Sequence, residues 1–318
     1  MNEILETTKF VADNSKQVFL DHSRIIEFAG NFRRGAASHW LSASPVGYAH
    51  LTNQQKLDLL LVFNSISFSY WGDPKWTIEY KGGRYDGSWA MIICIIRAID
   101  EKIPILDAQF RSSMSREDFR KFLRGNIEIP LFEERWNITK EIGGGLLKGY
   151  GGNFANFIKS AGGDGLRLLK LIIKTFPSFD DVAQYGGRPV YFYKRAQLLV
   201  EDIYQAFGGE GYGSLKNMDQ FTACADYKLP QSLRRLGIMK YAESLSGKID
   251  NKIPLPSGSE EEVEIRANTI WAVEFIKQAL QNDGQNATSI GVNDHLWLMG
   301  QDKQNNHQPY HRTRTTAY

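Results

Sequence analysis

One acidic residue stands in a setting typical of a functional carboxylate. Asp226 lies within Phe221–Tyr241 (FTACADYKLPQSLRRLGIMKY), after three small or soft residues and shortly before Pro230. Proline disfavours helical backbone at the preceding residue, and the leucine spacing that follows predicts a short helix ending at Gly237. We therefore expect Asp226 in a turn between two helices, with its carboxylate facing a pocket. The alternative is that Asp226 only caps the following helix, because Asp is favoured at such positions.

Two adjacent basic residues form a second candidate. Lys194 and Arg195 lie near the start of a helix predicted within Val190–Phe207, where apolar residues recur at four-residue spacing. Adjacent residues on a helix point about 100° apart, so at most one of the two can face a pocket directly. That residue could hold a phosphate, and the guanidinium of arginine is the better group for bidentate binding. The alternatives are a solvated pair or a buried arginine paired with a carboxylate.

An aromatic cluster follows the first strongly apolar segment. Leu57–Trp71 reads as a buried helix that runs into Phe68, Tyr70 and Trp71. These rings could form a wall on which a flat heterocycle stacks, an interaction that needs only a π-face. The alternative is that they belong to the ordinary core.

Glycine-rich segments raise the question of a nucleotide-binding loop. Gly143–Gly145 is followed by no Gly-Lys-Ser/Thr and is preceded by no predicted strand, so it fits neither a P-loop nor a dinucleotide fingerprint. We expect these glycines, together with Gly149, Gly151 and Gly152, at helix ends and in close packing.

Several further motifs accompany the Asp226 segment along the chain. In order, they are Ser67-Phe68-Ser69-Tyr70-Trp71, Phe192-Tyr193-Lys194-Arg195-Ala196-Gln197, the Asp226 segment, Glu262-Val263-Glu264-Ile265-Arg266, Leu296-Trp297 and Pro309-Tyr310-His311-Arg312. Together they resemble, in the same order, the motifs of the queuosine salvage proteins. That family resembles N-glycosylases that release the base queuine from queuosine 5′-phosphate.

The resemblance implies a reaction and a carboxylate that serves it. Breaking a ribosyl C–N bond passes through an oxocarbenium-like state, which a nearby carboxylate can stabilise. Asp226 is the residue that we expect in this role. The implied substrate is a 7-deazaguanine nucleotide, whose carbon at position 7 cannot be protonated, so the leaving base needs help at another edge. The resemblance implies no metal and no other cofactor.

The position that would recognise the base departs from the family pattern. The family has Asp four residues before the tryptophan, whereas this chain has Asn293 four residues before Trp297. Asp294 is one step off that register, so either Asp294 does the work or an amide replaces the carboxylate. An asparagine can accept a hydrogen bond from an N–H edge but brings no charge. We treat Asp294 as a second candidate catalytic residue.

The remaining candidates are expected to bind substrate. The loop near residue 40 offers His39, preferred over His50 for a pocket histidine that the family has in this region. The tail is expected to pack near the site rather than to be disordered. The full predicted binding set is His39, Phe68, Trp71, Lys194, Arg195, Cys224, Ala225, Tyr227, Asn293, Trp297, His311 and Arg312.

The amino-acid composition excludes several classes of protein. The chain has 318 residues, 42% of them hydrophobic and 23% charged, with a net charge of +2. This balance fits a soluble protein with a substantial core and lacks the basic excess of a protein that holds a long phosphate backbone. The two cysteines, Cys94 and Cys224, have no metal-site or disulfide spacing and fit a reducing compartment. With no signal peptide and no apolar run of about 18 residues, we expect a cytoplasmic protein with no membrane partner.

The predicted elements are nearly all helices joined by Gly/Pro turns. They include a helix over Glu264–Leu280 and a central helix over Trp89–Ile99, although the β-branched run of the latter could also form a strand. We therefore expect an all-α fold, a single domain over residues 1–318, in which residues 1–55 are a helical lead-in. By family resemblance, the fold is expected to be related to the helix-hairpin-helix DNA glycosylases. Two other functions remain open: a glycosylase that acts on a base in a nucleic acid, and a non-catalytic protein that binds queuine or queuosine.

Overall fold

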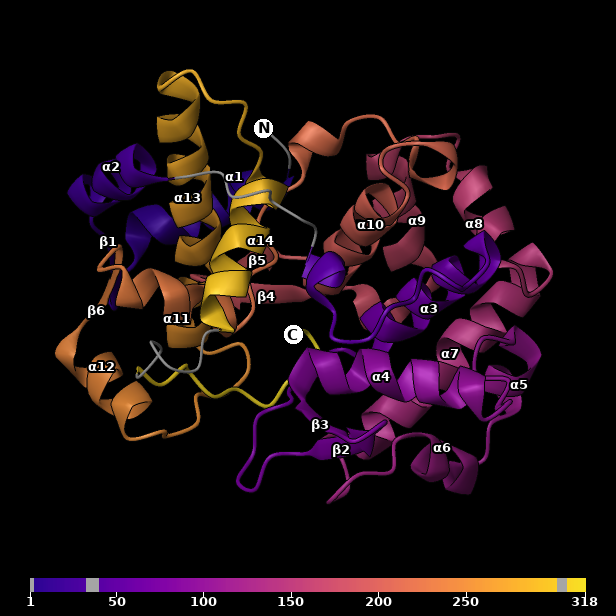
Figure 1. Cartoon of the computed structure of the whole chain (residues 1–318). Helices are drawn as coiled ribbons and strands as arrows, with labels where there is room; N and C mark the ends of the chain where they lie inside the picture. Colours follow the sequence, from indigo (N-terminus) through magenta and orange to yellow (C-terminus); the bar gives the residue numbers. More distant parts are fainter. Residues whose placement is uncertain (1–2, 33–39, 302–307) are drawn as a thin grey trace.

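The computed structural model describes residues 3–32, 40–301 and 308–318, and most of this chain is helical (Figure 1). The prediction of a mainly helical fold is confirmed. Figure 1 shows two groups of helices side by side. The first group contains α1 (Glu3–Asn14), α2 (His22–Asn31), α11 (Lys228–Arg235), α12 (Glu243–Asp250), α13 (Glu260–Asn282) and α14 (Ser289–Gly300). The second contains α3 (Asn53–Ile66), α4 (Gly87–Asp100), α5 (Ala108–Ser113), α6 (Arg116–Phe122), α7 (Phe132–Tyr150), α8 (Phe154–Ser160), α9 (Gly165–Thr175) and α10 (Lys194–Ala206).

Helix α13 is the centre of the first group. It packs against α1, α2, α11 and α14. The predicted helix over Glu264–Leu280 is confirmed, and it begins four residues earlier because the Ser259 side chain accepts a hydrogen bond from the Glu262 backbone N–H. Three glutamates in its first turn suit the positive end of the helix dipole.

Helix α4 shows why an apolar run became a helix rather than a strand. Every residue from Ala90 to Ala98 is buried, because α4 packs against α3, α6 and a small strand pair. A helix that is apolar on all sides is stable only when it is enclosed in this way. The segment thus confirms the prediction of a central helix.

Three pairs of short antiparallel strands were not predicted. They are β1 (Val18–Leu20) with β6 (Met239–Tyr241), β2 (Thr77–Tyr80) with β3 (Gly83–Asp86), and β4 (Val182–Tyr185) with β5 (Arg188–Tyr191). Each strand has only three or four residues, too few to show a period-2 pattern. The β1–β6 pair also joins segments that are distant in the sequence, which no local pattern indicates.

The triple glycine lies inside α7 rather than at its end. A Cβ on Gly143 would stand 2.6 Å from the Ser112 N atom and 2.7 Å from the Ala108 O atom, whereas a Cβ on Gly144 would have nothing within 4 Å. Close packing of α7 on α5 is therefore the reason for Gly143, as expected. The helix-end role is wrong for Gly143–Gly145 but is confirmed for Gly151, the left-handed C-cap residue of α7.

These two glycines give a matched test of that packing. We expect Gly143→Ala to lower the free energy of unfolding by about 1–3 kcal/mol, because the backbone must move apart. Gly144→Ala should raise it by about 0.5–1 kcal/mol through better helix propensity. Urea denaturation of both variants checks this, and equal effects of the two would contradict the packing argument.

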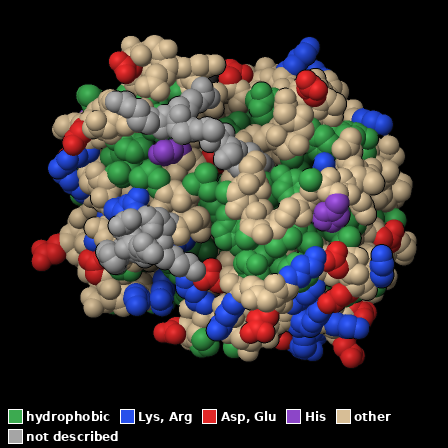
Figure 2. Space-filling view, in the orientation of Figure 1, with side chains coloured by type: hydrophobic (Ala, Val, Ile, Leu, Met, Phe, Trp, Pro, Cys, Tyr) green, Lys and Arg blue, Asp and Glu red, His purple; other side chains and the backbone are tan. Residues whose placement is uncertain are grey.

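The surface offers a mixed pattern of charge. On the face shown in Figure 2, hydrophobic side chains gather between the two helical groups, and positive and negative side chains mingle along the lower edge. Across the described ranges, no helix has the length and apolar character needed to cross a membrane.

Candidate active site

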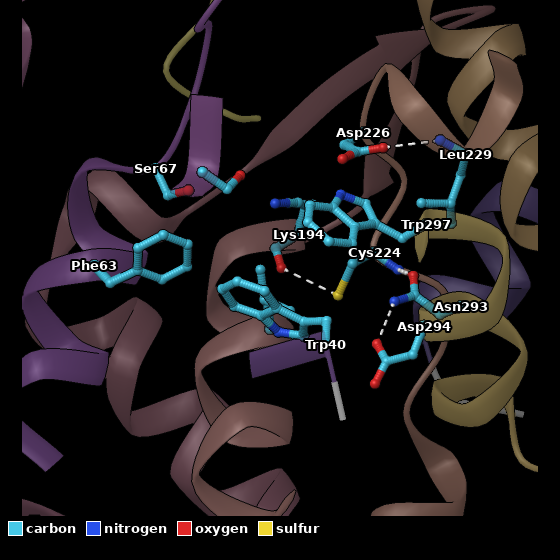
Figure 3. A pocket seen from close by; sticks show the side chains of 12 residues that line it. Trp40, Phe63, Ser67, Lys194, Cys224, Asp226, Leu229, Asn293, Asp294 and Trp297 are labelled. Carbon is cyan, nitrogen blue, oxygen red and sulfur yellow. Dashed lines mark hydrogen bonds between the residues drawn. The ribbon is translucent and has the colours of Figure 1, made fainter. Parts of the chain in front are cut away.

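A cavity lies where the two helical groups meet. One wall comes from the 3₁₀ helix η1 (Trp40–Ala43) with α3, α4 and α10, and the other from α11, α14 and the segment that precedes α11. Clefts between groups of helices are common places for small-molecule sites. Its lining residues, drawn in Figure 3, are Trp40, Phe63, Ser67, Ser88, Lys194, Leu198, Cys224, Asp226, Leu229, Asn293, Asp294 and Trp297. We call it the base cavity, after the base that the sequence resemblance leads us to expect in it.

Asp226 is both a capping residue and a wall of this cavity. Its Oδ1 atom accepts hydrogen bonds from the backbone N–H groups of Lys228, at 2.7 Å, and Leu229, at 3.0 Å. The carboxylate therefore satisfies two N–H groups at the start of α11, and Asp226 still contributes to the cavity surface. The sequence offered a helix cap and a pocket carboxylate as alternatives for Asp226, and the structure shows that the two are compatible.

The charge state of Asp226 is set by two opposing effects. Burial raises the pKa of this carboxyl above its usual value, while the Lys194 ammonium and the two backbone N–H groups lower it. A carboxyl group in a cleft, with a pKa perturbed by burial and by a nearby cation, is a candidate functional group.

Lys194 and Arg195 point into different surroundings. Lys194, at the first turn of α10, lines the base cavity, and its backbone N–H donates to Asp181 Oδ2 at 3.2 Å. Arg195 is buried in the core, where it donates to the backbone carbonyls of Ser65 and Ser178. Its guanidinium also lies 5.2 Å from the centre of the Phe68 ring. Of these two basic residues, Lys194 is therefore the one that lines the cavity.

Of the three aromatic residues that line the cavity, Trp297 was in the predicted binding set, and Trp40 and Phe63 were not. Trp40 lies with its ring centre 5.1 Å from Phe63 and 5.4 Å from Trp297, and all three line the cavity. Trp89 packs behind them, 5.6 Å from Trp40. Phe68, in contrast, is buried under the Arg135 and Arg195 guanidiniums and lines neither this cavity nor its neighbour.

The far end of the base cavity carries amide, thiol and carboxylate groups. Asn293 accepts from the Cys224 backbone N–H at 3.0 Å and donates to Asp294 Oδ1 at 3.1 Å. Asn293 and Asp294, the two residues that the sequence offered for recognition of the base, both line the cavity. Figure 3 shows Asp226 and Asp294 at opposite ends of the labelled group.

A buried glutamate supports this end of the cavity. Glu201 Oε2 accepts from the Cys224 thiol at 3.5 Å, and its Oε1 atom is buried without a hydrogen-bond partner. Burial, followed by the charges of Asp294 and Asp202, raises the pKa of Glu201 well above its usual value. Burial and the neighbouring carboxylates therefore favour the neutral form of Glu201.

A second cavity adjoins the first. Ser88, Asp226 and Trp297 line both, and the second cavity is completed by Tyr70, Trp71, Lys75, Asp86, Gly87, Tyr227, Lys228, Gln301 and Tyr310. Of the predicted binding residues, Trp71 and Tyr227 thus lie in this neighbouring space. Asp226 stands where the two cavities meet.

The C-terminal tail packs against this second cavity. Trp71 Nε1 donates to the Thr313 carbonyl at 3.0 Å, and the Arg312 guanidinium lies 5.6 Å from the centre of a Trp71 ring. His311 is buried, contacts the Tyr318 hydroxyl at 3.1 Å and lines neither cavity. Burial and the nearby Arg266 lower the pKa of His311 to about 3, so it is a neutral packing residue.

Other predicted residues fall outside the cavity walls. Ala225 is buried and lines neither cavity, and His39 lies outside the described residues. Sequence reasoning missed Phe63, Leu198 and Glu201, which lie in predicted helices, and Ser88, which directly precedes one. The reason is that no pattern separates a cavity-facing position from a core position. Trp40 was visible only as an aromatic residue in a loop. Among the described residues, no group of three His, Cys, Asp or Glu side chains could hold a metal ion.

Comparisons with known proteins place the chain in a family. A family model described as queuosine salvage protein matches residues 48–318. A Sphaerobacter thermophilus protein named queuosine 5′-phosphate N-glycosylase/hydrolase is 38% identical, covering 99% of this chain and 97% of that protein. Proteins of the same name from Mus musculus and Bos taurus are 34% and 33% identical, each covering 98% of both chains. The chain therefore belongs to the queuosine salvage protein family.

Proposed function

We propose that this chain hydrolyses the N-glycosidic bond of queuosine 5′-phosphate and releases queuine and ribose 5-phosphate. Queuine would then be available for tRNA modification, with the reaction taking place in the cytoplasm. The observation that carries the proposal is the place of Asp226, a partly exposed carboxylate at the junction of an aromatic cavity and a polar cavity. The names of the relatives describe the same reaction.

Asp226 is the residue that we propose to act at the sugar. When the bond between the ribose C1′ atom and the base breaks, its electron pair leaves with the base, and positive charge develops on the ribose. A carboxylate held by two backbone N–H groups, and so unable to turn away, is well placed to stabilise that charge. Water then supplies hydroxide to C1′ and, on balance, a proton to the base.

Lys194 and the far wall are proposed to serve the leaving base. Negative charge builds up on the base as it departs, and the Lys194 ammonium in the same cavity can offset it. Trp40, Phe63 and Trp297 offer faces and edges to a flat ring, while Asn293 and Asp294 offer polar contacts to its edge. Asp294 is proposed as a base-binding residue, because it lies at the opposite end from Asp226.

Two other functions have weaker support. A glycosylase for polymeric nucleic acid would fit the proposed relation of this helical fold to helix-hairpin-helix DNA glycosylases. However, such proteins use many cationic contacts to phosphates, and the net charge is only +2. A non-catalytic queuine-binding protein would need the aromatic cavity but not a raised-pKa carboxylate beside a cation at its mouth.

The test is to incubate the purified protein with queuosine 5′-phosphate and to follow free queuine and ribose 5-phosphate by chromatography and mass spectrometry. Equal molar release of the two products is expected. Tight binding without release would favour the binding protein. Release only from a queuosine-containing oligonucleotide would favour the polymer-directed enzyme.

The pH dependence provides a separate test of the Asp226–Lys194 arrangement. Because Asp226 must be ionised to stabilise the sugar cation, kcat/KM should fall as pH decreases through its pKa, which burial raises above the usual value of about 3.9. Removal of the Lys194 charge should raise that pKa further, so Lys194→Met should shift the acid limb to higher pH.

Profiles of kcat/KM between about pH 4 and pH 8 would show this shift. Lys194→Arg is the matched control, because it keeps a cation and should leave the acid limb near its wild-type position. An acid limb that Lys194→Met does not move would contradict the proposed coupling, whatever the change in rate.

A further inference from the structure

Tyr318 is buried where the two helical groups meet. Figure 1 shows the segment that ends at this residue between them. Its hydroxyl donates to Glu262 Oε1 at 2.8 Å, in the first turn of α13. Its backbone carbonyl accepts from the Ser69 N–H at 2.8 Å, in the segment that follows α3. The side chain and the carbonyl of one residue thus join the first group to the second.

The segment before Tyr318 is fixed by further contacts to Ser69. The Ser69 Oγ atom donates to the Thr315 carbonyl at 2.7 Å and accepts from the Thr315 N–H at 3.1 Å. Arg314 Nη1 donates to the Ser69 carbonyl at 3.1 Å. Ser69 has a φ of 40°, a left-handed conformation that a residue with a side chain keeps only when its surroundings hold it there. The Tyr318 side chain is therefore presented to Glu262 from an anchored backbone.

The Tyr318 phenol reaches a buried cluster of one cation and two carboxylates. Arg266 Nη1 lies 3.0 Å from Asp181 Oδ1 and 3.6 Å from Glu262 Oε1. The Arg266 guanidinium is also 4.7 Å from the centre of the Tyr318 ring. Burial raises the pKa of Glu262, whereas Arg266 and the Tyr318 hydroxyl lower it. The hydroxyl thus helps Glu262 to keep its negative charge beside Arg266, and that charge helps to hold the guanidinium in place.

The same cluster caps the helix that carries Lys194. Helix α10 begins after Tyr193, a left-handed residue whose side chain makes no cap hydrogen bond. Asp181 takes over this role from another segment, since its Oδ2 atom accepts from the Lys194 N–H at 3.2 Å. Its backbone carbonyl also accepts from the Phe192 and Tyr193 N–H groups. Because Arg266 holds the Asp181 carboxylate, a shift of Arg266 moves the acceptor on which the first turn of α10 depends.

We propose that Tyr318 is a positioning residue that fixes the Lys194 ammonium in the base cavity. Its hydroxyl holds the cluster of Glu262, Arg266 and Asp181. The cluster holds the start of α10, and that turn sets where the ammonium stands. Tyr318 lines neither cavity, so it acts on the substrate through this chain of contacts. The inference rests on the proposed function, in which Lys194 serves the departing base.

Tyr185 offers a matched comparison, because its hydroxyl makes the same kind of contact at another place on α13. That hydroxyl also donates at 2.8 Å to a buried glutamate, Glu264. Glu264 accepts in addition from the Lys16 and Gln17 N–H groups, which lie between α1 and β1. Loss of either hydroxyl removes one hydrogen bond to a buried carboxylate, but the Tyr185 contacts lead to the N-terminal segment and those of Tyr318 lead to α10.

The first test compares Tyr318→Phe with Tyr185→Phe. For queuosine 5′-phosphate, we expect Tyr318→Phe to lower kcat about 10-fold or more, because a small displacement of a group that serves the reaction is costly even when the substituted residue is distant. KM should change little, since the walls of both cavities remain. Tyr185→Phe should keep nearly the wild-type kcat, although both variants should lower the urea midpoint of unfolding by similar amounts. An equal loss of kcat in the two variants, or none in Tyr318→Phe, would overturn the positioning role.

A double substitution asks whether the effect passes through Lys194. Added to Lys194→Met, which already removes the ammonium, Tyr318→Phe should lower kcat no further. Single-turnover measurements with excess enzyme follow this even when the reaction is slow. Glu262→Gln reaches the same cluster from the acceptor side and should reproduce the loss of kcat, so the test does not depend on the folding of one variant. A full additional loss in the Lys194→Met background would contradict the proposal.

The reactivity of Lys194 toward acetic anhydride tests its position without turnover. Lys194 is buried in the wild type, so we expect it to be acetylated several-fold faster in Tyr318→Phe but not in Tyr185→Phe. The exposed Lys240 is the internal reference, and peptide mass spectrometry measures both lysines. Unchanged labelling of Lys194 would overturn the positioning role while leaving the proposed function intact. If the wild type released no queuine, the proposed function would fail, and the labelling would still decide whether Tyr318 positions Lys194.

Discussion

Asp226→Asn is expected to lower kcat for queuosine 5′-phosphate by at least about 10²–10³-fold, the usual effect of removing one preorganised group that stabilises transition-state charge. The reason is that the amide is neutral and leaves the developing ribose cation without its counter-charge. Substrate binding should change much less, because the aromatic and cationic walls remain. Single-turnover kinetics together with calorimetric binding would separate the two effects.

The asparagine variant is chosen because Asp226 has two roles. An amide oxygen can still accept hydrogen bonds from the Lys228 and Leu229 N–H groups, so the start of α11 should be kept. Asp226→Ala removes both roles and should also cost about 1 kcal/mol of stability as a lost cap. If Asp226→Asn retained near wild-type turnover, the catalytic assignment would be wrong, and Asp294→Asn would be the next variant to measure.

Asp181→Ala is expected to lower the free energy of unfolding by about 3–5 kcal/mol, because it leaves a buried cation without its main partner. The Arg266 side chain is 2% exposed and the Asp181 side chain 8% exposed, and the Arg266 Nη1 atom lies 3.0 Å from Asp181 Oδ1. Glu262 Oε1 lies 3.6 Å from Arg266 Nη1 and remains in the variant as a second carboxylate partner. The expected loss of unfolding free energy is therefore toward the lower end of that range.

Denaturation in urea, followed by fluorescence, measures this loss. Glu133→Ala is the matched control, since it removes a carboxylate from the exposed Arg116–Glu133 pair and should cost about 0–1 kcal/mol. Asp181 also accepts from the Lys194 backbone N–H, so the variant should lose activity as well as stability. Equal stability losses in the two variants would contradict the importance assigned to burial.

Local sequence signals identified the elements that carry the site. The capping residues of α3 and α13 and the length of the apolar run in α4 are local features, so they predict helices without knowledge of neighbours. The place of Asp226 before a short helix was predictable for the same reason. The paired strands could not be foreseen, because each is only three or four residues long.

The side of a helix that faces the cavity depends on the whole fold. The sequence shows that at most one of Lys194 and Arg195 can face a pocket directly. Which one does so depends on tertiary contacts: Asp181 accepts a hydrogen bond from the Lys194 backbone N–H, and the carbonyls of Ser65 and Ser178 hold Arg195 in the core. In the same way, Phe68 became core while Phe63 became a cavity wall, although both lie in one aromatic segment.

The sequence by itself determined the mainly helical fold, the family and the carboxylate proposed to carry the reaction. These follow from periodicity, capping and the order of short motifs, all of which are local properties of the chain. Only the tertiary structure decided that Trp40 and Trp297 share one cavity, that Asp226 stands between two cavities, and that Lys228 lies beyond it. The physical reason is that a cavity is made by side chains from helices distant in sequence, and its shape and charge exist only once those helices have packed.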